Sequence, residues 1–173
     1  MESKTKFFGH PVHPMLIVFP LGLLATAVIF DIIYLSGGNP AFASASFYMI
    51  AAGILGGLLA ALFGFMDWLA IPSNSRAKSI GGWHGLGNVV IVALFAVSWL
   101  LRRDNVNFVP GGLALTLSFL GVGLALITGW LGGELIYRLG VAVDPGANVN
   151  APSSLTNSTP AASNVNVKRT SQR

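Results

Sequence analysis

Three histidines and two carboxylates are the residues of this chain whose spacing could support chemistry. His10 and His13 lie in a Gly-His-Pro-Val-His-Pro stretch near the N-terminus, and His84 follows in the second half of the chain. Asp67 and Glu134 lie near the ends of two long apolar runs. Imidazoles and carboxylates ligate zinc, iron, manganese or copper, and histidine titrates near neutral pH. These residue types predict a metal site, a haem site or a proton path, provided that the fold brings them together.

The composition predicts a protein that is embedded in a membrane. The 173 residues are 53% hydrophobic and 9% charged, whereas a soluble domain carries roughly 25% charged residues. So few charges cannot cover a surface that faces water, so we expect a lipid bilayer around the protein. The chain has no cysteine, which excludes disulfides and thiolate metal sites. Basic and aromatic residues do not interleave in a patch, which argues against nucleic-acid binding.

Four apolar runs are each long enough to cross a bilayer, which takes about 20 residues in a helix. We therefore expect an all-α integral membrane fold, a bundle of four transmembrane helices. Pro20 should kink the first helix, because proline cannot donate a backbone hydrogen bond. Gly53 and Gly57 in the second helix form a small-residue pair that lets helix backbones approach closely in lipid. The expected helices cover residues 14–34, 43–69, 84–101 and 112–137.

The two ends of the chain are expected to lie outside this bundle. Residues 1–13 form a short segment that carries the His-Pro motif, and residues 145–173 are rich in Ala, Asn, Ser and Pro, which predicts a disordered tail. A residue before proline disfavours the helical region, so His10 and His13 should both have a non-helical backbone. The first apolar run is longer than a signal-peptide core of about 7–15 residues, so we expect it to stay in the protein.

The basic residues predict the orientation. With four spans, both termini and the loop of residues 71–82 share one side of the membrane, and most lysines and arginines fall on that side. The opposite side holds only Arg102 and Arg103. Because positively charged loops stay in the cytoplasm, both termini should be cytoplasmic.

The same topology should gather the polar residues at the cytoplasmic face. The first and third helices begin there with a histidine, and the second and fourth end there with a carboxylate. This order is that of two similar hairpins repeated about an axis along the membrane normal. Asn88 lies one helical turn after His84 and could orient its imidazole. The candidate metal ligands are His10, His13, Asp67, His84 and Glu134.

Several interpretations fit this cluster. A metal ion could take the paired histidines near the N-terminus, His84 and an acid, and one haem b could take His13 and His84 as axial ligands. The cluster could also relay protons. Alternatively, the histidines anchor helix ends or bond a carbonyl, and the acids pair with neighbouring arginines and lysines. Asp31, near the opposite face, is expected to make a polar contact between helices.

Several stretches together resemble a known family. They are Gly9–Pro14, Phe19–Gly22 with Asp31, Gly64–Trp68 and His84–Asn88. Over about residues 7–145 the chain resembles the bacterial membrane proteins catalogued as domain of unknown function 2231. The resemblance implies a four-helix inner-membrane protein with no assigned reaction. Some relatives are joined to Rieske-type or other redox domains, which favours electron transfer. Without cysteine, this chain could hold a redox centre only through histidine.

We therefore expect a non-enzymatic module that binds a transition metal or haem b and exchanges electrons with a redox or other membrane-protein partner. A small transporter or proton-relay protein is the first alternative. A structural or partner-binding subunit, which could be a homo-oligomer, is the second. No catalytic residue is predicted, because no serine nucleophile lies in a recognisable motif.

Overall fold

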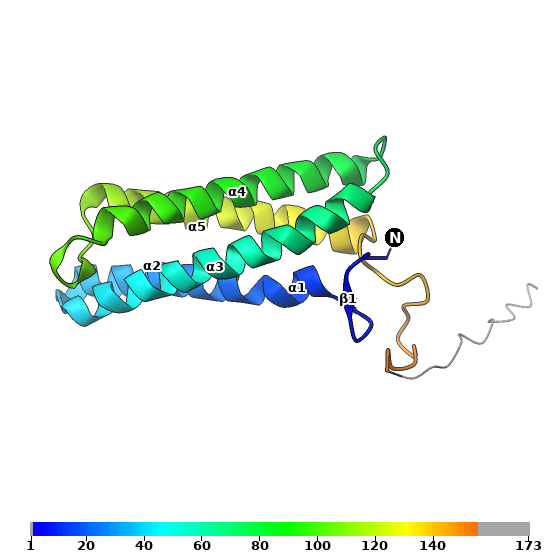
Figure 1. Ribbon diagram of the computed structural model, residues 1–173, viewed down its shortest axis with the longest axis horizontal. Coiled ribbons are helices and arrows are strands. Elements are labelled where there is room, and N and C mark those ends of the chain that lie inside the picture. The colour runs from blue at the N-terminus through cyan, green and yellow to red at the C-terminus, as the bar shows by residue number, and fades with distance from the viewer. Residues whose placement is uncertain (1, 156–173) are drawn as a thin grey trace, which may run out of the picture.

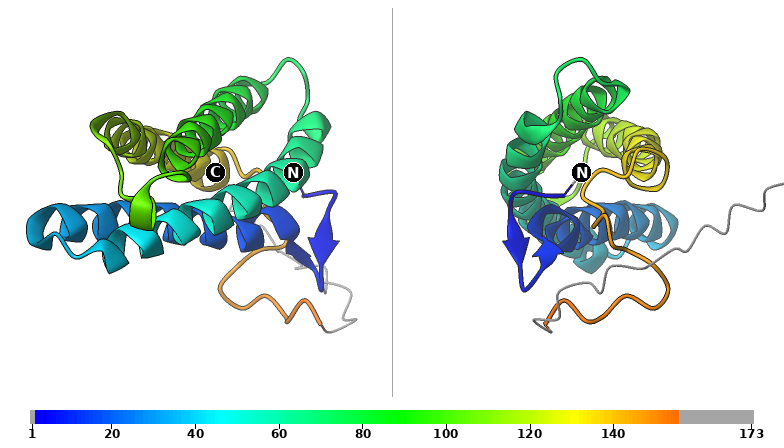
Figure 2. Two further views of the ribbon diagram at one scale, coloured as in Figure 1. Left: turned by 60° about the vertical axis from the view of Figure 1, so that its left-hand side comes forward. Right: turned by 90° about the vertical axis from the view of Figure 1, so that its right-hand side faces the viewer.

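The computed structural model describes residues 2–155 and confirms the four-helix membrane fold. Four helical stretches are long and apolar enough to cross a membrane: Val12–Gly37, Pro40–Ala70, Arg76–Arg102 and Gly112–Arg138. They run side by side along the long axis of the molecule (Figure 1). In the end-on view of Figure 2 they occupy four corners, with consecutive helices as neighbours. The predicted tail, residues 145–173, lies largely outside the described residues.

The first span is broken near its start. It consists of α1 (Val12–Leu16) and α2 (Val18–Gly37), which meet at Ile17. Pro20 explains the break, because a helix would need its missing N–H to bond the carbonyl of Leu16. The bonds on either side persist, from Ile17 N to His13 O and from Leu21 N to Ile17 O. The break expected from Pro20 therefore lies one turn before the proline, next to the carbonyl of Leu16, for which Pro20 supplies no N–H.

The second span, α3, runs from Pro40 to Ala70 and begins three residues before the predicted start. Asn39 caps it, since its side-chain oxygen accepts a hydrogen bond from Ala41 N at 3.0 Å. Pro40 occupies the first helical position, where the absence of an N–H costs nothing. The residues Asn39-Pro40 are thus the start signal of this helix.

The third span, α4, runs from Arg76 to Arg102, and its predicted start at His84 is wrong. Ser75 caps the helix by accepting a hydrogen bond from Lys78 N at 3.1 Å. Gly81 has a low helix propensity but lies inside this helix, where it lets α4 pack closely against α3. A Cβ at this position would lie 2.9 Å from the Trp68 ring of α3. Most of the predicted 71–82 loop is therefore helical. His84 lies about two turns inside the helix and not at its mouth.

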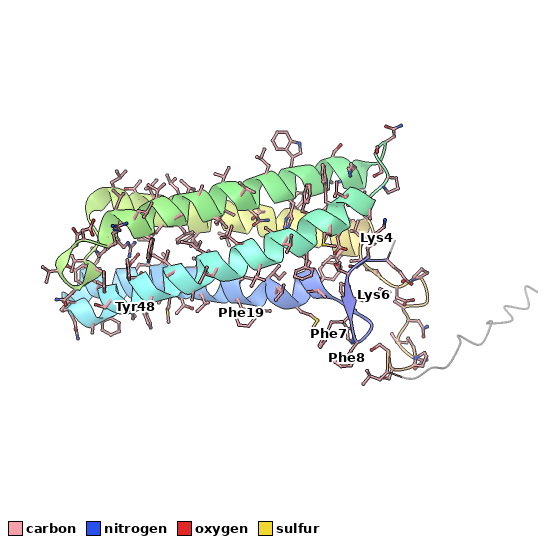
Figure 3. The ribbon with its side chains drawn as sticks, viewed as in Figure 1. Lys4, Lys6, Phe7, Phe8, Phe19 and Tyr48 are labelled. Atoms are coloured by element: carbon pink, nitrogen blue, oxygen red, sulfur yellow. The ribbon has the colours of Figure 1, made fainter. Side chains whose placement is uncertain are left out.

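The fourth span runs from Gly112 to Arg138. It comprises α5 (Gly112–Gly133) and the π-helical turn η2 (Glu134–Arg138), and a short 3-10 turn, η1 (Val106–Phe108), precedes it. At the other end of the chain, strands β1 (Lys6–Phe7) and β2 (His10–Pro11) form a small antiparallel hairpin. Its tip carries Phe7 and Phe8, which project at the end of the bundle (Figure 3).

The backbone of His10 is extended, as expected, but the prediction for His13 is wrong. His13 lies within α1, and its carbonyl accepts the hydrogen bond from Ile17 N at 3.2 Å. Its ring also bonds to α3, as described below. These contacts outweigh the preference that Pro14 imposes on the residue before it.

Two glycines bring the helices of each hairpin together in the core. A Cβ at Gly53 would lie 2.6 Å from Leu24, and one at Gly121 would lie 2.7 Å from Phe95, so a larger residue at either position would force that side chain to shift. Gly57 of α3 faces the second hairpin, since a Cβ there would lie 3.1 Å from Val92 of α4. The outer surface is apolar, with side chains such as Phe19 pointing away from the bundle (Figure 3). The protein therefore contacts lipid over its spans.

Candidate functional site

Of the three histidines, the structure brings His13 and His84 together. Their ring centroids are 6.4 Å apart and their planes are perpendicular, at 89°. His13 comes from α1 and His84 from α4, the helices that open the two hairpins. The pair therefore bridges the two halves of the molecule, within the spanning segments.

A backbone carbonyl fixes each ring. His13 Nδ1–H donates to Ala60 O of α3 at 2.8 Å, and His84 Nδ1–H donates to Thr128 O of α5 at 2.9 Å. A carbonyl oxygen only accepts, so Nδ1 carries a proton in both rings, and in the neutral form of each ring the lone pair is on Nε2. Both histidines therefore have the same tautomer.

The two Nε2 atoms have different surroundings. His84 Nε2 accepts a hydrogen bond from Asn88 Nδ2 at 3.1 Å, and Asn88 also bonds His84 O at 2.8 Å. Thr128 Oγ1 holds the other side of that amide, at 3.3 Å from Asn88 Oδ1. His13 Nε2 has no hydrogen-bond partner in the part of the chain that the structure describes. One lone pair is therefore occupied by an amide, and the other is open.

Two glycines that the sequence analysis did not assign to the site position these rings. Gly64 follows Ala60 by one helical turn, and a Cβ there would lie 2.8 Å from His13 Cε1. Gly132 follows Thr128 by the same interval, and its Cβ would lie 3.2 Å from His84 Cε1. The Cε1–Nδ1 edge of each imidazole therefore lies against a side-chain-free stretch of the neighbouring helix. Because every residue carries a backbone carbonyl, the sequence contained no signal that singled out these two glycines.

The two hairpins make the same contacts at corresponding positions. In each, the histidine ring donates a hydrogen bond to the carbonyl that lies one turn before a glycine. Leu24 lies as far after His13 as Phe95 lies after His84, and both pack on a core glycine. The register pairs Gly64 with Gly132, so Asp67 corresponds to Leu135 and not to Glu134. The histidines fit the hairpin similarity suggested by the sequence, and the acids do not.

The remaining predicted ligands lie elsewhere. Asp67 Oδ1 accepts hydrogen bonds from Ser3 Oγ at 2.6 Å and Lys4 N at 3.2 Å, which ties the N-terminal segment to the end of α3. Glu134 pairs with Arg76 at 2.6 Å, the kind of interfacial ion pair that was one alternative. His10 lies in the exposed β-hairpin.

The predicted metal site with three or four protein ligands is not formed. Among residues 2–155, no group of three or more His, Asp or Glu is placed to hold a metal ion. The reason is the early start of α4, because it moves His84 about two turns into the bundle, while the acids stay at the helix ends.

Asp31 forms a second polar centre, of which only the contact with another helix was expected. Its partner is Arg102, which the sequence placed among the charges outside the membrane. The guanidinium binds both carboxylate oxygens, at 2.7 and 2.8 Å, and both side chains are 0% exposed. Ser46 and Ser118 complete the network at 3.1 and 3.0 Å. Among the described residues, this leaves Arg103 as the one exposed cation at that end.

The fold and these two centres define a four-helix membrane protein built from two hairpins. The chain belongs to the family of domain of unknown function 2231, described as a predicted membrane protein, whose model matches residues 9–145. The matched range contains the histidine pair and the Asp31–Arg102 pair. No curated protein and no solved structure matches the chain.

Proposed function

We propose that the protein is a membrane module that holds one haem b between its hairpins, with His13 and His84 as axial ligands through Nε2. The observation that carries this proposal is the pair of Nδ1–H bonds to Ala60 O and Thr128 O. A histidine that ligates a metal almost always donates its other ring N–H to a carbonyl or carboxylate, which orients the ring and raises its basicity. Both rings already have this arrangement.

The number of ligands favours haem over a bare metal ion. Zinc and similar ions take three or four protein ligands, and the described residues supply two. The porphyrin supplies the equatorial ligands of haem iron, so two axial histidines complete its coordination. Of the two cofactors considered, haem b therefore suits this donor set better.

The spacing of the rings is compatible with this role. Metal–imidazole bonds are about 2.0–2.1 Å long, so two rings on opposite sides of one ion have centroids roughly 6 Å apart. The observed separation is 6.4 Å. Asn88 would have to release His84 Nε2, and its bond to His84 O would still hold the side chain.

Haem with two axial histidines supplies one-electron transfer and leaves no open position for a substrate. We therefore infer an electron-transfer function with a redox partner in the membrane, and no catalysis at the iron. The proton-relay alternative receives less support, because Asp67 and Glu134 are engaged away from the histidines.

We also propose a bacterial inner-membrane location with both termini in the cytoplasm. The end that holds the N-terminus carries several lysines and arginines, and Lys4 and Lys6 lie there in Figure 3. Burial of Arg102 removes one of the two cations at the opposite end. The difference in exposed positive charge between the two ends, which orients the spans, is therefore larger than a count of lysines and arginines in the sequence suggests.

The test is an absorption spectrum of protein purified in detergent from cells supplied with a haem precursor. We expect a Soret band that is lost in His13→Ala and His84→Ala. His10→Ala is the matched control and should keep the band, because His10 lies in the exposed β-hairpin. A folded wild-type protein without a Soret band would overturn the proposal and leave the histidines as links between helices.

A further inference from the structure

A shallow groove lies where the end of α3 meets the first turns of α4. Its lining combines two indole rings, one ammonium group and one hydroxyl group with an apolar wall. The lining residues are Trp68, Lys78, Ser79, Gly82, Trp83 and Leu86. Both helices are long and apolar enough to span a membrane, and the groove lies near their ends on the side of the chain's N-terminus (Figure 1). We therefore expect it at the boundary between the head groups and the hydrocarbon.

The ammonium group of Lys78 is held in place. Lys78 Nζ donates to Trp68 O at 2.7 Å and lies 3.9 Å from the centroid of the Trp68 ring. Trp68 Nε1 in turn donates to Lys78 O at 3.1 Å. An ammonium group has three donors. One bonds Trp68 O and the indole ring covers a second side, so one remains for a ligand. This reciprocal contact fixes a cation in the groove, where a surface lysine would otherwise move freely.

The groove carries an uncompensated positive charge. None of its lining residues is acidic. Helix α4 carries no acid, and both Asp67 of α3 and Glu134 of η2 have other partners. Asp67 accepts hydrogen bonds from the N-terminal segment, and Glu134 pairs with Arg76. Among the described residues, no carboxylate bonds Lys78, so an anion from outside the protein would neutralise it.

The other half of the groove is apolar and open to the bilayer. Trp83 is 67% exposed and Leu86 is 55% exposed, and both lie on the face of α4 that carries Ser79. A cation and a hydroxyl group thus lie above an indole and an aliphatic side chain on one helix face. From the head-group side inwards, polar groups are followed by apolar ones. A phospholipid has the same order, from its phosphate to its first acyl carbons.

We propose that this groove binds an anionic phospholipid, with its phosphate on Lys78 Nζ and Ser79 Oγ and its acyl chain along Trp83 and Leu86. A lipid that carries a net negative charge fits better than a zwitterionic one, because the amine of the latter already compensates its own phosphate. The groove does not include the histidine pair, so this proposal and the haem proposal are tested separately.

Native mass spectrometry of the full-length protein tests this proposal. The protein is purified in detergent and mixed with equal amounts of phosphatidylglycerol and phosphatidylethanolamine. We expect the wild type to retain phosphatidylglycerol preferentially, Lys78→Gln to lose most of that preference, and Lys78→Arg to keep it. Arg103→Gln, which removes an exposed cation at the other end of the bundle, is the control and should behave as the wild type. Equal retention by Lys78→Gln and the wild type would overturn the proposal.

A second variant covers the case in which Lys78→Gln fails to fold. Trp83→Ala removes an exposed wall of the groove without touching the core, and it should lower the retention of both lipids several-fold. Unchanged retention in Trp83→Ala would contradict the acyl-chain contact. Displacement of phosphatidylglycerol by excess inorganic phosphate would show a site for a free anion and would also overturn the assignment to a lipid.

Discussion

Asp31 and Arg102 form a bidentate ion pair between positions that correspond in the two hairpins. Asp31 lies as many residues after His13 as Arg102 lies after His84. Two corresponding positions thus carry opposite charges and meet inside the bundle. Pairing like hairpins would place two carboxylates or two guanidinium groups in contact, which is strongly unfavourable in a medium of low dielectric constant. The ion pair therefore favours association of the first hairpin with the second.

Removal of one partner of this pair should destabilise the protein. Arg102→Met leaves the buried carboxylate of Asp31 uncompensated, which costs about 3–5 kcal/mol in buried pairs. We expect a large fall in the melting temperature in detergent. Arg103→Gln, at the neighbouring exposed residue, is the control and should melt as the wild type does. Equal melting of the two variants would show that the ion pair is not important for stability.

A charge exchange tests whether the pair acts as a unit. Asp31→Arg combined with Arg102→Asp should recover part of the stability that either single change removes, because the hairpins again carry opposite charges. Recovery will be incomplete, since Ser46 and Ser118 are placed for the native arrangement. A double-mutant cycle from thermal melts gives the coupling energy. Simple additivity of the two single effects would contradict this account.

The glycines beneath the histidine rings can be tested independently of the ligands. Gly64→Ala should displace His13, because the new Cβ would lie 2.8 Å from the ring, and Gly132→Ala should have a smaller effect, at 3.2 Å from His84. We expect loss of the Soret band in the first variant and a weaker band in the second. Gly22→Ala is the control, because no atom lies within 4 Å of its Cβ. The reverse order of effects would argue against this geometry.

Substitution of Asn88 should change haem affinity and protein stability in opposite directions. Asn88→Ala removes the amide that occupies His84 Nε2, so haem affinity should rise. The haem-free protein should lose stability, because Asn88 makes three side-chain hydrogen bonds, each of which contributes about 0.5–1.5 kcal/mol. Haem titration and thermal melting measure the two effects. Weaker haem binding in this variant would mean that Asn88 supports the bound state.

The orientation can be measured cleanly because the chain contains no cysteine. Ser73→Cys places a thiol in the exposed loop between α3 and α4, and Asn105→Cys places one at the opposite end. An impermeant maleimide added to intact cells whose outer membrane has been permeabilised should label Asn105→Cys and not Ser73→Cys. Labelling of both after lysis is the control. The reverse pattern would place the termini outside the cytoplasm.

The four spans could be predicted because lipid demands long apolar runs, and composition alone reveals them. The start of α4 could not, since the Ser75 cap and the packing of Gly81 on Trp68 extend the helix through residues that resemble a loop. That extension decided the candidate site. It separated His84 from the acids and placed it beside His13.

By itself, the sequence determined the membrane fold and the family resemblance, and it singled out His13 and His84 as candidate ligands. Only the tertiary structure decided which residues meet. It paired each histidine with a carbonyl one turn before a glycine, and it buried Arg102 against Asp31. The physical reason is that hydropathy depends on each residue alone, whereas a hydrogen bond or an ion pair depends on the register between helices. That register is set by close contacts such as those at Gly53 and Gly121.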